Sequence, residues 1–273
     1  MKENNIRYTA HLPDANGYIK YSDAENQVWT VLYDRQIKLI QGRANHNYLS
    51  GLHKLNFSRN TIPQPIEVSN IIREITGWEV APVPALIDFN LFFDLLSKKC
   101  FPAASFIRRI EDLDYLPEPD IFHELFGHCP LLTEPNYAEF HREVGKFGIT
   151  VSREDQIMLG RLFWYTVEFG LIHDPDGLKI YGAGILSSTA ESLYALDSPL
   201  PQRKPFDLIE ALRTPYRYDE MQKTYFTINS FAELYNMING KLVDAFKEAR
   251  ALGMLPNLHH PKTNPPTINQ GIY

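Results

Sequence analysis

Two histidines stand five residues apart, between residues that suit the start of a helix and one that stops it. Pro119 and Asp120 suit a first helical turn, where a missing N–H costs nothing and an acidic side chain meets the positive end of the helix dipole. Pro130 cannot continue that helix. On a regular α-helix this spacing leaves side chains about 140° apart, so His123 and His128 can face one point only if the helix ends or bulges between them. The spacing therefore predicts two imidazoles aimed at a shared ligand through an irregular helix.

A metal ion is one ligand that two neutral imidazoles would share, although histidine is also common in cores and on surfaces. Zinc proteases place their histidines one helical turn apart with a glutamate after the first; here Glu124 follows His123, but His128 comes one residue too late. Glu168 offers a third ligand, because it is the only carboxylate of the apolar segment 161–170 and a buried carboxylate requires a partner. Arg161 is one candidate partner, in a plain salt bridge. A metal is the other, since two histidines and a carboxylate form the ligand set of non-haem Fe(II) sites.

The composition describes a folded, acidic chain. Its 273 residues suit one domain, include no Gly/Ser-rich or charged linker, and are 44% hydrophobic, which argues against disorder. A net charge of −6 provides no basic face for nucleic acid or an anionic membrane. The start of the chain is polar, no apolar segment reaches membrane-spanning length, and Cys100 and Cys129 are too few for a disulfide scaffold. We therefore expect a cytoplasmic protein, a monomer or small homo-oligomer, without nucleic-acid or membrane partners.

Hydrophobic periodicity and capping signals predict a mainly α-helical protein with a few short β-strands. Ser22 and Glu25 form a capping box ahead of one helix, and Ser230 with Glu233 opens a last long helix that should run to about Gly253. The other expected helices cover residues 67–76, 88–96, 120–128, 137–147 and 155–169, and extended segments cover 78–83 and 178–181. The many alternating runs of the 2-oxoglutarate oxygenase β-scaffold are absent. We expect a single catalytic domain over residues 1–273, with residues 254–273 as an extended, proline-rich tail.

Three motifs follow one another along the chain: residues 117–120 (PEPD) leading into 123–128 (HELFGH), residues 164–170 (WYTVEFG) and residues 181–188 (YGAGILSS). In this order they resemble the pterin-dependent aromatic amino acid hydroxylases, from about residue 76 to residue 192. The resemblance implies the catalytic-domain fold of that family without a regulatory domain. It also implies an Fe(II)-dependent monooxygenase with His123, His128 and Glu168 as metal ligands, which hydroxylates L-phenylalanine to L-tyrosine with O2.

Oxygen insertion needs electrons, and the chain contains no dinucleotide fingerprint or haem motif to deliver them. A diffusible reductant is therefore required, and the resemblance supplies a tetrahydropterin, either tetrahydrobiopterin or another bacterial pterin. It assigns the pterin-stacking ring to Phe92 and a water-mediated contact to Glu124. It also assigns backbone contacts to the segment that holds Ala85 and Leu86. From the residues alone, Phe92 is typical of a core and Glu124 of a solvated helix face.

An amino-acid substrate requires a cation for its carboxylate, which a guanidinium can hold at two points. The resemblance assigns this role to Arg108, and Arg109 is expected in a surface salt bridge. Trp164 precedes Glu168 by one helical turn, so it can wall an aromatic pocket beside the metal. The resemblance adds three further substrate contacts, namely Pro119, Gly184 and Ser187. Ser187 is also expected to orient a metal-ligating histidine.

Several alternatives stay open at this point. Tryptophan could be the substrate within the same family. A different class of protein would be a helical binding module with a structural metal, which requires a closed four-ligand zinc site, or a hydrolase that uses zinc-bound water. The identity of the metal separates these alternatives. The remaining histidines, His141 and His259 among them, are expected to be structural or solvated.

Overall fold

The computed structural model describes residues 8–84 and 87–259. Helices dominate and strands are few and short, which confirms the predicted fold class. The α-helices are α1 (Asp23–Leu39), α2 (His46–Leu55), α3 (Pro65–Thr76), α4 (Phe89–Ser97), α5 (Pro135–Gly148), α6 (Arg153–Phe163), α7 (Ala183–Leu186), α8 (Thr189–Asp197), α9 (Leu208–Arg213), α10 (Phe231–Ile238) and α11 (Leu242–Leu252). The strands are β1 (Glu79–Val83), β2 (Cys100–Ala104), β3 (Leu171–Asp174), β4 (Gly177–Ile180), β5 (Gln202–Pro205) and β6 (Thr224–Ile228). Short 3-10 turns are η1 (Ile110–Asp112) and η3 (Leu131–Thr133), and π-helical segments are η2 (His123–His128) and η4 (Trp164–Glu168).

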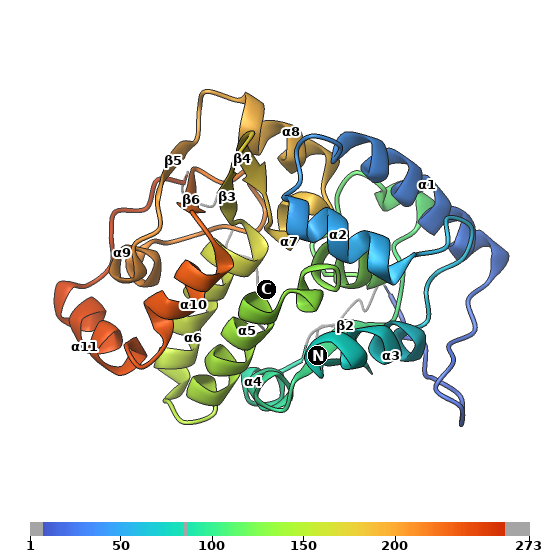
Figure 1. Ribbon diagram of the computed structural model, residues 1–273, viewed down its shortest axis with the longest axis horizontal. Helices are drawn as coiled ribbons and strands as arrows, with labels where there is room; N and C mark the ends of the chain where they lie inside the picture. The colour runs from blue at the N-terminus through green and yellow to red at the C-terminus, as the bar shows by residue number, and fades with distance from the viewer. Residues whose placement is uncertain (1–7, 85–86, 260–273) are drawn as a thin grey trace, which may run out of the picture.

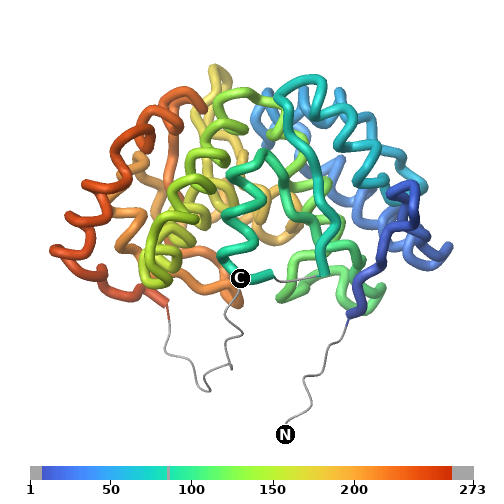
Figure 2. The backbone as a smooth tube through the Cα atoms, turned by 90° about the horizontal axis from the view of Figure 1, so that it is seen from below, coloured from blue at the N-terminus to red at the C-terminus, as the bar shows by residue number. Residues whose placement is uncertain are grey.

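The chain crosses the molecule from one end to the other (Figure 1). Helices α1, α2 and α3 lie at one end and α9, α10 and α11 at the other, with α5 and α6 between them. Figure 2 shows the same order from below. Helices α4 and α10 both pack against α5 and together bury much of its surface. The main cluster of buried apolar side chains extends from Val28 in α1 to Ala249 in α11, and a second, small cluster contains Tyr8, Ala104 and Phe106.

The strands form two small sheets. Strands β1 and β2 form a parallel pair, and the second sheet has the order β4-β3-β6-β5, with β3 and β4 antiparallel. The β3–β4 hairpin begins directly after η4 and leads back to α7, so it returns the chain to the end of η4. At that return, a Cβ on Gly182 would lie 2.4 Å from the carbonyl oxygen of Glu168. Only glycine permits this close approach, and α7 consequently packs against both π-helical segments.

Most of the predicted helices and strands are present in the structure, but the prediction of one long last helix is wrong. The capping box of Ser22 and Glu25 opens α1 as predicted. The predicted last helix does not run unbroken to Gly253, because α10 ends at Ile238 and α11 begins at Leu242. Gly240 between them has φ +70°, the left-handed conformation that favours glycine, and Asn-Gly is a strong turn signal.

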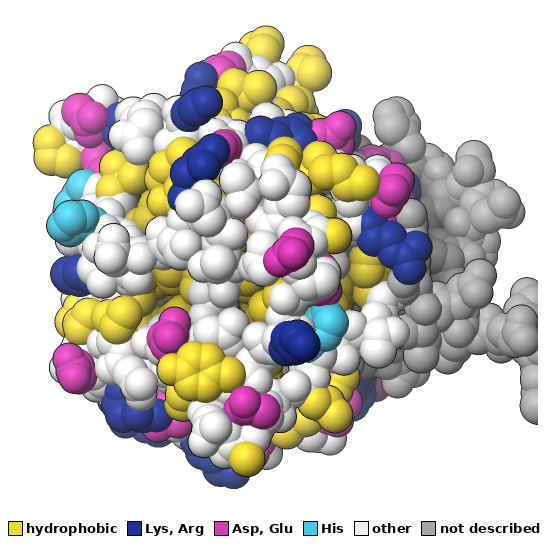
Figure 3. Space-filling view, turned by 90° about the vertical axis from the view of Figure 1, so that its right-hand side faces the viewer, with side chains coloured by type: hydrophobic (Ala, Val, Ile, Leu, Met, Phe, Trp, Pro, Cys, Tyr) yellow, Lys and Arg dark blue, Asp and Glu magenta, His cyan; other side chains and the backbone are white. Residues whose placement is uncertain are grey.

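Charged side chains of both signs are interspersed on the face shown in Figure 3, with apolar side chains between them. Within the described residues, no helix combines the length and the apolar character needed to cross a membrane. Residues 254–258 follow α11 without helix or strand, and the backbone N–H of Leu255 donates to the carbonyl of Arg213. The described beginning of the predicted tail is therefore held at the end of α9.

Candidate metal centre and adjoining cavity

His123 and His128 meet because η2 is a π-helix. The backbone N–H of Cys129 bonds to the carbonyl of Glu124, five residues earlier, at 3.3 Å. This wider turn replaces the α-helical turn and brings residues with this spacing to the same side. The Nε2 atoms of His123 and His128 lie 2.9 Å apart, with their rings almost perpendicular. The predicted bulge between the two histidines is therefore confirmed.

Glu168 completes the group from η4, the second π-helical segment. Its carboxylate oxygens lie 3.2 Å from Nε2 of His128 and 3.6 Å from Nε2 of His123. All three side chains are buried, and their ligand atoms lie within 4.8 Å of one another. Arg161, the salt-bridge partner that the sequence offered, donates instead to the carbonyl of Leu212 at 3.2 Å.

The protonation of His123 suits a metal ligand. Burial lowers the pKa of His123 to about 4, so the ring is neutral near pH 7. The hydroxyl of Ser187 donates to the carbonyl of Ala183 at 2.8 Å, and its oxygen lies 2.9 Å from Nδ1 of His123. Because that hydroxyl proton is already committed, Nδ1 must be the donor to Ser187. Nε2 of His123 then presents its lone pair to the group, and two imidazoles with one carboxylate fit a divalent transition metal.

Removing the Ser187 hydroxyl should weaken metal binding. Ser187→Ala leaves the second nitrogen of His123 without its acceptor, and losing such a partner typically lowers metal affinity about 10- to 100-fold. Ser188→Ala is the matched control, because Ser188 caps α8 through the N–H of Glu191. Competition with a chelator measures both dissociation constants for Fe(II). Equal affinities in the two variants would show that Ser187 does not orient His123.

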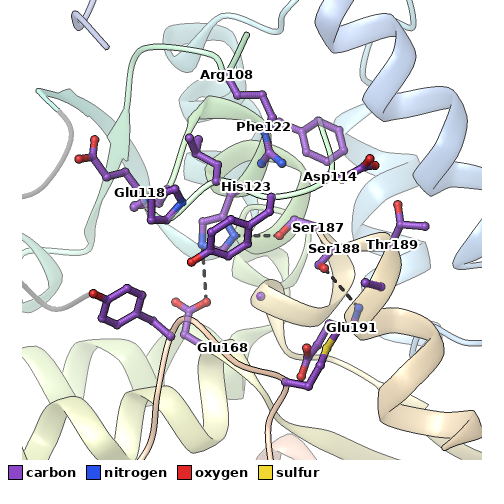
Figure 4. A pocket seen from close by; sticks show the side chains of 18 of the residues that line it. Arg108, Asp114, Glu118, Phe122, His123, Glu168, Ser187, Ser188, Thr189 and Glu191 are labelled. Carbon is purple, nitrogen blue, oxygen red and sulfur yellow. Dashed lines mark hydrogen bonds and ion pairs between the residues drawn. The ribbon is translucent and has the colours of Figure 1, made fainter. Parts of the chain in front are cut away.

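A cavity of about 470 Å³ opens beside this group. Its lining includes every residue that the sequence assigned to the substrate, namely Arg108, Pro119, Trp164, Gly184 and Ser187. His123 and Glu168 also line it, whereas His128 lies behind them with none of its surface exposed. Figure 4 shows Arg108 on one side of His123 and Glu168 on the other. The candidate ligands thus face a space that a small molecule can enter.

Arg108 is buried and held by Asp120. Its Nε and Nη2 donate to the two carboxylate oxygens of Asp120 at 2.8 and 2.9 Å. Burial alone would raise the pKa of Asp120, but the Arg108 guanidinium keeps that pKa below its usual range. The same carboxylate accepts from the backbone N–H of His123 at 3.1 Å. Asp120 therefore positions both the arginine and the start of η2, and the sequence had indicated only the second of these roles.

The Nη1 atom of Arg108 makes fewer hydrogen bonds to the protein than the edge that holds Asp120. Nη1 makes one long hydrogen bond, 3.4 Å, to the carbonyl of Leu113. A two-point clamp on a ligand must therefore use the Nη1–Nη2 edge, because the Nε–Nη2 edge already holds Asp120. Arg109, by contrast, is exposed, and its guanidinium carbon lies 5.6 Å from the centre of the Tyr8 ring.

Trp164 is fixed by residues that the sequence did not single out. Its indole N–H donates to the side-chain oxygen of Gln222 at 2.9 Å, and its ring stacks on Tyr216 at 4.2 Å. The amide nitrogen of Gln222 donates to the carbonyls of Arg217 and Glu220, which orients its oxygen toward Trp164. The loop before β6 thus fixes this wall of the cavity. No sequence motif marked Gln222, because its partner lies far away along the chain.

Two residues expected to bind a pterin, Phe92 and Glu124, are not part of this cavity lining. Phe92 is buried, with its ring edge-on to Phe163 at 5.3 Å. Glu124 is also buried, so it does not lie on a solvated helix face, and burial raises its pKa well above the ordinary value, with Glu168 adding to the effect. Its nearest hydrogen-bond donor is the N–H of Ala104 at 3.5 Å. Two further expected contacts, Ala85 and Leu86, lie outside the described residues.

The geometry agrees with comparisons to known proteins. A sequence model described as biopterin-dependent aromatic amino acid hydroxylase matches residues 3–247. A phenylalanine-4-hydroxylase of Pseudomonas aeruginosa is 48% identical over 257 residues, covering 94% of this chain and 97% of that protein. The solved structure of phenylalanine hydroxylase from Legionella pneumophila is 50% identical, covers 91% of this chain and 98% of the other, and superposes with a TM-score of 0.88. The Chromobacterium violaceum enzyme with bound oxidized Fe(III) is 41% identical, with coverages of 89% and 91% and a TM-score of 0.84.

Proposed function

The chain belongs to the biopterin-dependent aromatic amino acid hydroxylases, and on this basis we propose that it is an Fe(II)- and tetrahydropterin-dependent monooxygenase that converts L-phenylalanine and O2 to L-tyrosine. One observation carries the proposal: a buried group of two imidazoles and a carboxylate borders a cavity that also contains a buried arginine. Such a ligand set leaves coordination positions open, unlike a closed structural zinc site.

Metal binding is assigned to His123, His128 and Glu168. When bound, Fe(II) and a reduced pterin supply the activation of O2 that no side chain of this protein can provide. The protein itself holds the metal ligands in place. Ser187 fixes the tautomer of His123, and Asp120 fixes the start of η2. The burial of the three ligands limits their contact with water to the side that faces the cavity.

Substrate binding is assigned to the cavity. The Nη1–Nη2 edge of Arg108 would hold the carboxylate of phenylalanine, while Asp120 keeps the guanidinium in place. Trp164 and Pro119 provide apolar walls for the ring. Gly184 lies so near η4 that a Cβ there would be 3.1 Å from the carbonyl oxygen of Glu168, so glycine preserves both the cavity and the ligand. Holding ring and carboxylate at once would fix the orientation of the ring relative to His123 and Glu168, which line the same cavity.

Pterin binding is assigned to Phe92, Glu124, Ala85 and Leu86, as the family resemblance implies. Phe92 would stack on the pterin ring and Glu124 would bind it through water, with tetrahydrobiopterin or another bacterial pterin as the natural cofactor. We also assign the chain to the cytoplasm as a single catalytic domain, a monomer or small homo-oligomer. The main apolar cluster, which extends from α1 to α11, supports the one-domain assignment.

The pterin requirement tests this function. Because the chain contains no electron-donor motif, phenylalanine turnover should vanish when pterin is omitted and reduced nicotinamide alone is supplied. Phe92→Ala should raise the KM for pterin more than the KM for phenylalanine, because stacking on an aromatic ring contributes about 0.5–1.5 kcal/mol. Product analysis for tyrosine, with tryptophan as a competing substrate, reads out both points. Turnover with nicotinamide alone would refute the proposed reaction.

A further inference from the structure

Four buried polar atoms behind the metal centre have no hydrogen-bond partner among the described residues. They are Nδ1 of His128, Nε2 of His141, the hydroxyl of Tyr137 and Nε1 of Trp78. None of the four side chains has any exposed surface, and none lines the cavity. Leaving a buried donor or acceptor unsatisfied costs about 1–3 kcal/mol for each group. A cluster of four therefore needs a physical explanation.

Ring contacts, in part through Phe101, link these four side chains, which belong to η2, to α5 and to the residue before β1. The rings of Tyr137 and His141 lie 4.5 Å apart, and the ring of Trp78 lies edge-on to His141 at 5.9 Å. Phe101 packs against both histidines, at 4.8 Å from His128 and 6.4 Å from His141. His141 thus contacts both Tyr137 and Trp78, and Phe101 packs against His141 on one side and the metal ligand His128 on the other.

Of the two histidines, His128 can donate a hydrogen bond and His141 can accept one. Nδ1 of His141 lies 2.9 Å from the carbonyl of Tyr137, which can only accept, so this nitrogen carries the proton. Burial lowers the pKa of His141 to about 3, so the ring is neutral and Nε2 is an acceptor. His128 directs Nε2 toward His123 and Glu168. With that nitrogen committed to a metal, Nδ1 of His128 carries the proton and is a donor.

A metal-ligating histidine almost always donates its second N–H to a carboxylate, a carbonyl or a water. His123 has such a partner in Ser187, whereas the described residues provide none for His128. We propose that an internal water joins Nδ1 of His128 to Nε2 of His141 and to the hydroxyl of Tyr137, which makes His141 a positioning residue for the metal ligand. A buried water typically makes about three hydrogen bonds, and these groups offer one donor, one acceptor and a hydroxyl that can serve as either. The inference rests on the proposed metal site.

Such a water would fix the orientation and tautomer of His128 from the side opposite the metal. Removing its acceptor should therefore weaken metal binding, although His141 touches neither metal nor substrate. The sequence had given His141 only a structural or solvated role.

Metal affinity and spectra test the inference without any assay of turnover. Co(II) is titrated into metal-free wild type, His141→Leu, His141→Gln and Tyr137→Phe, against a competing chelator, and the Co(II) absorption spectrum is recorded. His141→Leu should raise the Kd about 10- to 100-fold and alter the spectrum. His141→Gln, whose amide oxygen restores an acceptor, should recover part of the affinity. Tyr137→Phe keeps the ring and should raise the Kd less, so both variants carry the test if His141→Leu does not fold.

Val144→Ala is the matched control for stability. Val144 is a buried apolar residue on the same helix, α5, so its truncation should lower the Tm of the metal-free protein and leave the Kd unchanged. An unchanged Kd in folded His141→Leu and His141→Gln would overturn the inference, as would equal weakening by Val144→Ala. Failure of wild type to bind Co(II) would instead overturn the metal site, and the inference with it. A high-resolution crystal structure should show the water within hydrogen-bond distance of both histidines, and an empty gap there would contradict it.

Discussion

Replacing any one of His123, His128 and Glu168 by alanine is expected to remove iron from the protein and to abolish tyrosine formation. The three ligand atoms lie within 4.8 Å of one another in a buried site, so the loss of one leaves a two-ligand site that cannot retain Fe(II) against competing chelators. Elemental analysis after gel filtration gives the iron content of each variant. Circular dichroism then separates loss of metal from loss of fold.

His173→Ala is the matched control for this prediction. His173 lies on β3, the strand that follows η4, and its side chain is exposed. Its removal should leave one iron per chain and normal turnover. Full iron retention in all three ligand variants, or stoichiometric zinc in an active enzyme, would contradict the assignment.

Arg108→Ala should reduce kcat/KM for phenylalanine strongly while the iron content stays normal. Arg108 is buried and lines the cavity, where it would pair with the substrate carboxylate, and removing one partner of a desolvated charge pair costs about 2–5 kcal/mol, on the order of 30-fold to several thousand-fold in kcat/KM. Arg108→Lys should recover only part of the loss, because an ammonium cannot both hold Asp120 and present a planar two-point edge. Steady-state kinetics at saturating pterin provide the measurement.

Arg109→Ala is the control for Arg108, since the two residues are adjacent and only Arg109 is exposed. A solvated contact is worth roughly 0–1 kcal/mol, so kcat/KM should fall less than about tenfold. Asp120→Asn should give an intermediate loss, because Asn keeps the shape of the partner and loses its charge. An equal or larger effect at Arg109 would mean that Arg108 does not bind the carboxylate.

The meeting of the two histidines could be predicted from the sequence, because their spacing is local information. The spacing of His123 and His128, with Pro130 after them, required an irregular helix, and the structure forms a π-helix there. The same holds for the capping box of α1, where Ser22 and Glu25 lie within one helical turn.

What the sequence missed depends on contacts between distant segments. Asp120 suited a helix start, but nothing local showed that it would also hold Arg108. Gln222 fixes Trp164 across 58 residues of chain, and no pattern along the sequence indicates that distance in space. His141 is a further example, because only the folded structure shows that its Nε2 atom is buried without a hydrogen-bond partner among the described residues.

Titrating metal-free protein with Fe(II) while following tyrosine formation tests the central claim most directly. With phenylalanine, tetrahydropterin and O2 in excess, the rate should rise linearly and reach its plateau at one iron per chain, and zinc in place of iron should give no tyrosine. Zinc-supported turnover, or a rate independent of added iron in protein shown to be metal-free, would contradict an iron-dependent hydroxylase built on His123, His128 and Glu168.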